Sequence, residues 1–180
     1  MPNRLTKGKA LAGAVNVPAS GLYIADTAIT ATATELNRAA DVSGRIINGT
    51  ASGTLTITEA THDGKIVLLN RAGGFHTVLP AATGSGAKLQ FIVATTGTVA
   101  AAYTIAAAGN DTMFGNAMYV TDNSGTVVGF KASGGTLITL NGSTTAGIKG
   151  DSIELFDIAT DTWWVNVRAA GTGAEATPFS

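Results

Sequence analysis

From residue 45 onward the sequence is a succession of short apolar or alternating runs separated by Gly, Asn, Asp and Ser. In Thr54–Thr58, Leu55 and Ile57 face one way and the threonines the other, while Lys88–Thr95 is apolar enough for a central strand. Turn clusters recur about every 8–12 residues, the spacing of all-β sandwiches and barrels. The sequence therefore predicts an all-β fold of about nine to eleven strands, a compact antiparallel sandwich or barrel-like domain.

The predicted strands end where turn residues begin. In chain order they are Thr54–Thr58, Lys65–Asn70, His76–Leu79, Lys88–Thr95, Tyr103–Ala107, Met113–Val120, Thr126–Lys131, Thr136–Leu140, Ser152–Ile158 and Trp163–Arg168. Gly115 interrupts the run Met113–Val120. No exact internal repeat of solenoid or propeller period is present in the sequence.

One helix is predicted, over Thr30–Gly44. Thr32 and Glu35 have the spacing of a capping box, Leu36 lies on a small apolar face with two alanines, and Gly44 suits the helix end. A helix of roughly ten residues is marginal alone in water, so this one must dock on something. It would join two unlike parts of the chain.

The chain divides into four predicted regions. Residues 1–28 resemble an extended N-terminal arm, because glycines and Pro18 break any helix and apolar residues occur at intervals. Residues 29–44 form the helix and junction, residues 45–170 the β domain, and residues 171–180 a polar C-terminal tail that leaves the domain surface. A disordered terminus is the alternative for the arm, but a solvated tail is usually richer in charge.

Composition excludes several classes of function. Only 13% of residues are charged and the net charge is −1, which argues against nucleic-acid binding, since that affinity comes mainly from Lys and Arg. No run approaches the roughly 20 apolar residues of a membrane span. The absence of cysteine excludes disulfides and thiolate chemistry.

No set of residues predicts an active site. His62 lies beside Asp63 in what the sequence predicts to be an exposed turn, and His76 begins a strand as a partly exposed residue. Neither histidine has neighbours spaced for a zinc site or a nucleophilic triad. We therefore expect no enzymatic activity, no metal, no cofactor and no small-molecule ligand.

Two loops and an acidic hairpin contain residue types that are found in known kinds of site. Glu154 and Asp157 are predicted to be solvated hairpin charges rather than a glycosidase pair. Residues 84–88 resemble a phosphate loop, but the spacing is wrong for a Walker A motif and a strand follows. Residues 122–125 are predicted to form a turn, because they lack the length and terminal acid of an EF-hand.

Trp163 and Trp164 are the only tryptophans in the sequence. Adjacent strand residues point to opposite faces, so one is expected in the core and the other at solvent, a sugar or a subunit. Tryptophan is enriched at interfaces, which favours a buried interface for the outward-facing residue.

Residues 29–45 (ITATATELNRAADVSGR) resemble a segment of tailed-bacteriophage virion proteins in which a Thr-Ala-rich lead precedes a short helix and a β domain. The turn at residues 80–84, the segments 140–144 and 147–151, and the tryptophan-bearing terminal hairpin are similar to features of small phage head-decoration (cement) proteins. The resemblance covers residues 29–180 and leaves the arm outside it.

The resemblance implies a homotrimer on the outer capsid surface of the virion, made in the host cytoplasm, with the major capsid protein as its partner and no membrane or nucleic acid bound. Such a trimer would stabilise contacts between capsomers, with its weak individual interfaces acting together. The residues expected at the capsid or subunit interface are Leu11, Val15, Leu22, Tyr23, Ile24, Leu36 and Trp164.

Two alternatives remain open. Segments like Glu35-Leu36-Asn37 also occur in tail fibres, so a trimeric tail-fibre, baseplate or receptor-binding protein is the first. A carbohydrate-binding domain is the second, supported by the tryptophan pair and the acidic hairpin. Sparse aromatic residues and the lack of an obvious sugar-binding cluster count against the first alternative.

Overall fold

The structure, a computed structural model, describes residues 23–24, 27–28, 43–122 and 125–180. The chain forms two compact units, Met1–Val42 and Ser43–Ser180. In the first unit, β1 (Tyr23–Ile24) pairs antiparallel with β2 (Thr27–Ala28). The rest of the predicted arm lies outside the described residues, as does the predicted helix apart from its last two residues. Those two residues belong to a 3₁₀ turn, η1 (Ser43–Arg45).

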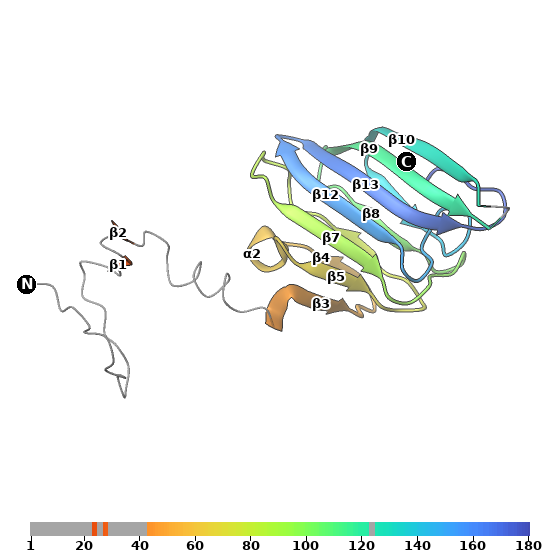
Figure 1. The fold of residues 1–180 in the computed structure, drawn as a ribbon, viewed down its shortest axis with the longest axis horizontal. Coiled ribbons are helices and arrows are strands. Elements are labelled where there is room, and N and C mark those ends of the chain that lie inside the picture. The colour runs from red at the N-terminus through yellow and green to blue at the C-terminus, as the bar shows by residue number, and fades with distance from the viewer. Residues whose placement is uncertain (1–22, 25–26, 29–42, 123–124) are drawn as a thin grey trace, which may run out of the picture. The chain divides into compact units, whose positions relative to one another are not determined.

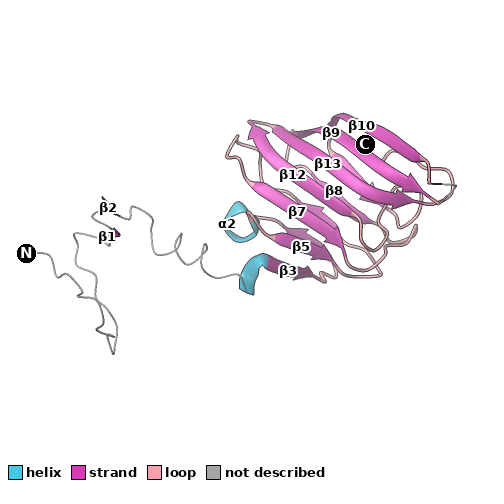
Figure 2. Cartoon of the chain, viewed as in Figure 1, coloured by secondary structure: helices cyan, strands magenta, loops and turns pink. Residues whose placement is uncertain are grey.

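The second unit is an all-β domain of two packed sheets, as the sequence predicts (Figures 1 and 2). The larger sheet contains, in spatial order, β10 (Val127–Gly135), β9 (Thr112–Thr121), β13 (Thr162–Gly171), β12 (Ser152–Ala159), β7 (Lys88–Val93), β5 (Ile66–Leu69) and β3 (Ile46–Gly49). The smaller sheet contains β11 (Leu137–Leu140), β8 (Tyr103–Ala106), β6 (His76–Val78) and β4 (Thr54–Thr56). A single helical turn, α2 (Glu59–His62), follows β4.

The sheets are mixed, so the prediction of an antiparallel sandwich is wrong in that detail. From β3 to β8, successive strands alternate between the two sheets. The chain therefore winds in three coils, each of which gives one strand to each sheet. Strands reached after a full turn run in the same direction, so β3·β5·β7 and β4·β6·β8 are parallel. Each parallel crossover is made by a strand of the opposite sheet, in place of the helix of a βαβ unit.

Two hairpins extend this coiled part. In one, β9 pairs antiparallel with β10, and in the other β12 pairs with β13. β12 joins the coils through β7, and β13 pairs parallel with β9. Gly115 lies within β9 at φ 153°, and a Cβ there would collide with the Val165 carbonyl of β13. The glycine that interrupts the strand pattern thus permits β9 and β13 to pair.

The core lies between the inner faces of the two sheets. Burial alternates along β7 and through most of β12 and β13, so every second side chain enters the core. Trp163, Tyr103 and Phe91 are among the largest fully buried side chains. The Tyr103 hydroxyl lies 2.6 Å from the Arg71 carbonyl and 2.9 Å from the Thr95 carbonyl, so it joins two loops at one end of the core.

The C-terminal tail does not leave the surface, contrary to the sequence prediction. Phe179 is buried against the core and bridges Ile138 of β11. The Leu137 amide donates to the Ser180 carbonyl at 3.0 Å, and the Ser180 amide donates back to the Leu137 carbonyl at 3.0 Å. The tail therefore covers the edge of the smaller sheet, an arrangement that protects an otherwise unpaired strand.

Candidate interaction surface

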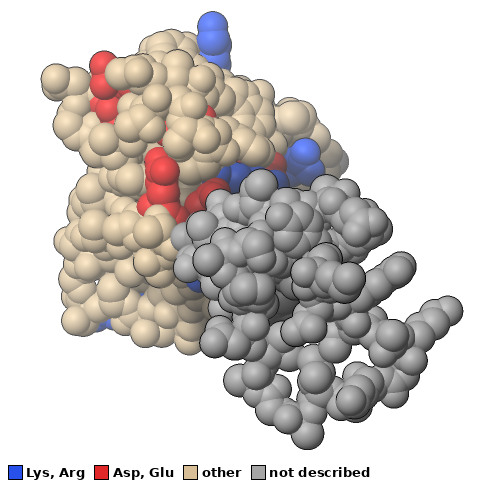
Figure 3. Space-filling view, turned by 90° about the vertical axis from the view of Figure 1, so that its left-hand side faces the viewer, with Lys and Arg blue, Asp and Glu red and all other residues tan. Residues whose placement is uncertain are grey.

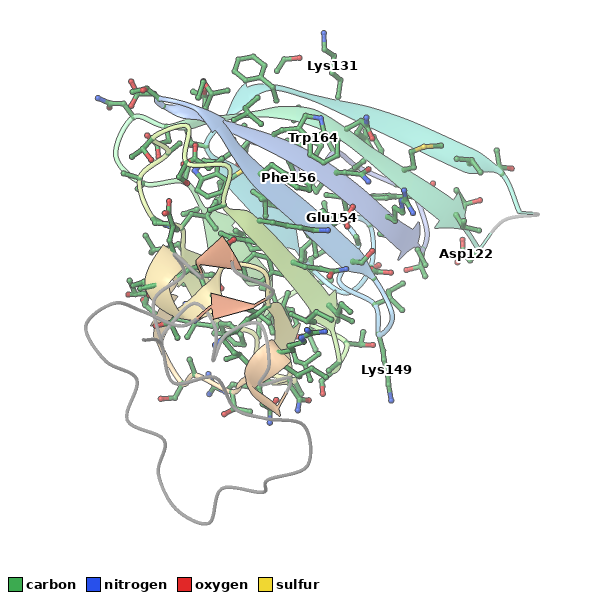
Figure 4. All side chains as sticks on the ribbon, turned by 60° about the vertical axis from the view of Figure 1, so that its left-hand side comes forward. Asp122, Lys131, Lys149, Glu154, Phe156 and Trp164 are labelled. Carbon is green, nitrogen blue, oxygen red and sulfur yellow. The ribbon has the colours of Figure 1, made fainter. Side chains whose placement is uncertain are left out.

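The candidate surface is the outer face of the larger sheet, which presents aromatic, amide and aliphatic side chains to solvent. Strand register aligns these side chains into rows that cross the sheet. Figure 4 shows Glu154, Phe156 and Trp164 on β12 and β13, within two neighbouring rows near the sheet centre. Charged groups are few on the face of the domain seen in Figure 3, in keeping with the composition.

The first row, here called the aromatic row, consists of Phe156, Trp164 and Phe114. Phe156 is opposite Trp164 in the β12·β13 register, and Trp164 is opposite Phe114 in the β13·β9 register. The rings of Phe156 and Trp164 have centroids 5.5 Å apart with planes tilted by 58°. Lys88 continues the row onto β7, and its Nζ lies 5.3 Å from the Phe156 ring centroid. This cation–π contact helps to hold the Phe156 ring in place.

The second row, here called the polar row, consists of Gln90, Glu154, Asn166 and Asn116. These four side chains are register partners on β7, β12, β13 and β9. Lys88 Nζ lies 3.7 Å from Glu154 Oε1, so the one acid in the row is paired with a cation. Within the part of the chain that the structure describes, the three amide side chains form no hydrogen bond.

Beyond these rows lies an apolar surface at the β9–β10 border, here called the edge patch, made of Met118, Val120 and Val127. These side chains are 53%, 56% and 52% exposed. Together with Arg168 they line a shallow hollow. Large apolar side chains gathered at one place on a soluble domain mark a contact surface more often than scattered ones do.

The loop that resembles a phosphate loop does bind an anion, but the anion belongs to the chain. The amides of Thr83, Gly84 and Ser85 donate to the Asp157 carboxylate at 2.9, 2.7 and 3.0 Å. The Ser85 hydroxyl adds a hydrogen bond of 2.8 Å. Burial alone would raise the pKa of Asp157, yet these donors together lower it below its usual value. Asp157 is thus buried and structural, contrary to its prediction as a solvated hairpin charge.

A second buried carboxylate closes another turn. Asp151 accepts hydrogen bonds from the amides of Gly147 and Ile148, each at 2.8 Å, and from Ala170 at 2.9 Å. Burial raises the pKa of Asp151, and these three donors offset part of that effect. This carboxylate therefore fixes segment 147–151 against β13.

The histidines differ from each other in their surroundings. His76 is exposed on β6, with Nδ1 2.7 Å from the Thr104 hydroxyl oxygen, as its predicted strand position suggests. His62 is buried, so the prediction of an exposed turn is wrong. It ends α2, and the Thr58 amide donates to its Nδ1 at 3.1 Å. The folded-back ring thus gives the amide of Thr58, the residue that precedes the helix, a hydrogen-bond partner.

The predicted interface residues are only partly described. Trp164 lies on the outer face, and Trp163 fills the core. Leu11, Val15, Leu22 and Leu36 lie outside the described residues; Tyr23 and Ile24 form β1, of which only the backbone is described. The edge patch was missed by the sequence prediction. The feature of the sequence that points to the edge patch is the position of Met118 and Val120 at every second residue of β9. That alternation alone does not tell which face of the strand packs in the core and which faces solvent.

The described residues carry neither a metal-binding cluster nor a membrane-spanning helix. No three or more His, Asp or Glu side chains there are grouped to hold a metal ion. No helix in those same ranges is long and apolar enough to cross a membrane. Of the predicted turn at residues 122–125, only Asp122 and Gly125 are among the described residues.

The fold and this face define the chain as an all-β, two-sheet domain with a candidate interaction surface. No protein-family model matches the chain, and no curated protein matches its sequence.

Proposed function

We propose that the chain is a structural protein of a tailed-bacteriophage virion, a homotrimeric head-decoration (cement) protein that binds the major capsid protein on the outer capsid surface. In this role it stabilises contacts between capsomers and has no enzymatic activity or cofactor. The resemblance of residues 29–180 to such proteins, together with the all-β domain, supports the proposal.

The single observation that carries an assembly role is the edge patch. Val120 and Val127 are opposite each other on neighbouring strands, and Met118 lies on the same face, so the apolar surface is continuous. Leaving three such side chains half exposed has a cost of about 25 cal/mol for each Å² of apolar area that remains in water. A second copy of the chain or a capsid subunit removes this cost by covering the patch.

The face, rather than the backbone edge, is the contact surface in this proposal. β10 is one of the two edge strands of the larger sheet, and Lys131 projects from its exposed face. Charged side chains, especially lysine, are a common protection of edge strands against pairing with other chains. We therefore assign the subunit contact of the trimer to the edge patch.

Substitution within the edge patch tests this assignment. Val120→Lys places a charge at the centre of the patch, and it should convert a trimer into a monomer in size-exclusion chromatography with light scattering. Val99→Lys is the matched control, because Val99 is 74% exposed and lies outside the strands. Both variants should retain the same circular dichroism. A Val120→Lys chain that remains trimeric would contradict the assignment.

The location on the particle needs a separate experiment. Purified chain is mixed with undecorated heads of the phage that encodes it and imaged by cryo-electron microscopy. Regular density over the head, and protection of the heads against heat, are expected. Density confined to the tail tip would favour the tail-fibre or receptor-binding alternative and overturn the cement proposal.

The N-terminal arm adds a further test of the same proposal. Deletion of residues 1–28 should leave the β domain folded, because that domain begins at Ser43. Occupancy on heads should fall, because the deletion removes the apolar residues proposed to contact a neighbouring subunit. If the truncated chain decorates and protects heads as well as the full chain does, the arm takes no part in binding.

A further inference from the structure

The polar row presents hydrogen-bonding capacity that the domain itself does not use. Gln90, Asn166 and Asn116 carry amide donors and acceptors that have no partner among the described residues. All three are partly or fully exposed, on neighbouring or nearby strands. An apolar partner pressed onto this row would leave these groups buried and unpaired, which costs about 1–3 kcal/mol for each group. The centre of the face therefore fits a ligand rich in hydroxyl groups better than it fits an apolar protein surface.

The aromatic row supplies the second half of such a site. A pyranose ring has an apolar face of C–H bonds and a rim of hydroxyl groups. The face packs on an aromatic ring, and the rim needs donors and acceptors beside it. Residues two positions apart on a strand are separated by about 7 Å, so a sugar stacked on Trp164 reaches Asn166 with its hydroxyl groups.

We propose that the centre of the outer face is a binding site for a neutral oligosaccharide. The sugar stacks on Trp164, packs against the tilted ring of Phe156, and is hydrogen-bonded by Gln90, Glu154 and Asn166. This proposal does not depend on the proposed function in the virion, since it concerns the isolated domain and uses residues outside the edge patch.

The charge of the site favours a neutral sugar over an acidic one. Glu154 and Lys88 form an ion pair at 3.7 Å, and the remaining members of the polar row are uncharged amides. Arg168 lies one row further, opposite Ser152 and Met118, and therefore beside the edge patch. An anionic sugar would find no unpaired cation within the two rows themselves.

The extent of the site favours an oligosaccharide over a single sugar. Phe156, Trp164 and Phe114 lie on three adjacent strands, and neighbouring strands are about 4.8 Å apart. The platform therefore crosses the strands over a width of more than one sugar ring. The polar row runs parallel to it across the same strands, so each ring placed along the platform meets a polar side chain.

Titration calorimetry of the full chain tests the proposal. The probes are cellohexaose, hexa-N-acetylchitohexaose and maltohexaose as neutral ligands, with polygalacturonate as the anionic comparison. At least one neutral hexasaccharide should bind, with a dissociation constant of about 1 mM or tighter. Trp164→Ala and Asn166→Ala should each weaken binding at least tenfold, and Trp164→Phe should retain part of it. Asn166→Ala serves as the second variant if Trp164→Ala fails to fold.

Lys149→Ala is the control, because Lys149 is exposed in a loop away from the two rows (Figure 4) and should bind like the wild type. The proposal is overturned if none of the three neutral hexasaccharides binds, or if binding is unchanged in both Trp164→Ala and Asn166→Ala. Binding of polygalacturonate alone would also overturn it. A change of oligomeric state in Asn166→Ala, without loss of fold, would assign this face to a protein contact instead.

Discussion

The Gly84 amide donates a hydrogen bond of 2.7 Å to Asp157 Oδ1, which joins two segments 73 residues apart in the sequence. Neighbouring amides of the same loop donate to the other carboxylate oxygen. The glycine-containing loop at residues 83–86 therefore binds an anion of the chain itself, the Asp157 carboxylate near the end of β12. This contact ties the turn before β7 to the β12·β13 hairpin.

Asp157→Asn should destabilise the domain by about 2–3 kcal/mol, because charge-assisted hydrogen bonds are lost and an amide group replaces one acceptor oxygen. Urea denaturation followed by tryptophan fluorescence measures the change. Asp161→Asn is the matched control, since Asp161 is exposed and has φ 57°, a conformation that asparagine tolerates. Equal stability of the two variants would show that the loop contact contributes little.

The same carboxylate gives stability a pH dependence of known sign. The pKa of Asp157 is lowered in the folded state, so its contribution is present above the unfolded value of about 3.9 and is lost as pH falls through the folded pKa. The pKa of Asp151 is raised, so its contribution has the opposite sign and is lost as pH rises through its folded pKa. Denaturation midpoints measured on the acid side of neutrality should fall less steeply with acid in Asp157→Asn than in the wild type.

Gly115→Ala should destabilise the domain by more than about 2 kcal/mol, because the new methyl group collides with the backbone of β13 at an unfavourable φ. Thermal unfolding measures the loss. Gly129→Ala, on the neighbouring strand, is the control: its nearest contact would be the Ala117 carbonyl at 4.0 Å. Similar melting temperatures for the two variants would refute the close approach of β9 and β13.

The two tryptophans should differ in how much stability their truncation costs. Trp163→Ala removes a fully buried side chain and should cost about 3–5 kcal/mol. Trp164→Ala removes a partly exposed ring and should cost far less, since its main aromatic contact is with Phe156 on the outer face. Chemical denaturation of both variants checks the order, and a larger loss for Trp164→Ala would reverse the assignment of inner and outer faces.

Phe179→Ala should destabilise the domain by about 2–4 kcal/mol, although it lies next to the chain end, because its ring is part of the core. Hydrogen exchange should also become faster in β11, whose edge the tail covers. Ala174→Ser serves as the control for a substitution in an exposed part of the tail. Unchanged exchange in β11 would mean that the tail does not protect that edge.

The strand positions were predictable because turn residues and period-2 patterns are local properties. The runs predicted at Lys88–Thr95 and Ser152–Ile158 match β7 and β12 closely. Sheet membership was not predictable, since nothing in the pattern of β4 or β5 says that they belong to different sheets. The coils also differ in length: Ile46 pairs with Ile66, and Ile66 pairs with Gln90, so the number of residues from one coil to the next changes. No sequence repeat of fixed period therefore reveals the coils.

The candidate site was harder to predict from the sequence than the fold was. The opposite directions of Trp163 and Trp164 follow from strand geometry alone, and the structure identifies Trp163 as the inner residue. The polar row depends on register between strands far apart in sequence, as when Gln90 aligns with Glu154. The predictions of exposure for Asp157 and His62 are wrong for a similar reason. The burial of each side chain depends on backbone amides, from another segment for Asp157 and from a local turn for His62.

The alternation of β3 to β8 between the two sheets constrains how such a chain can change in length during evolution. A single inserted strand would shift every later strand into the wrong sheet and reverse which side chains enter the core. Insertion or loss of a strand pair, such as one equivalent to β5 with β6, lengthens or shortens both sheets together and leaves the downstream hairpins in register. Length variation among relatives of this chain should therefore come in whole coils.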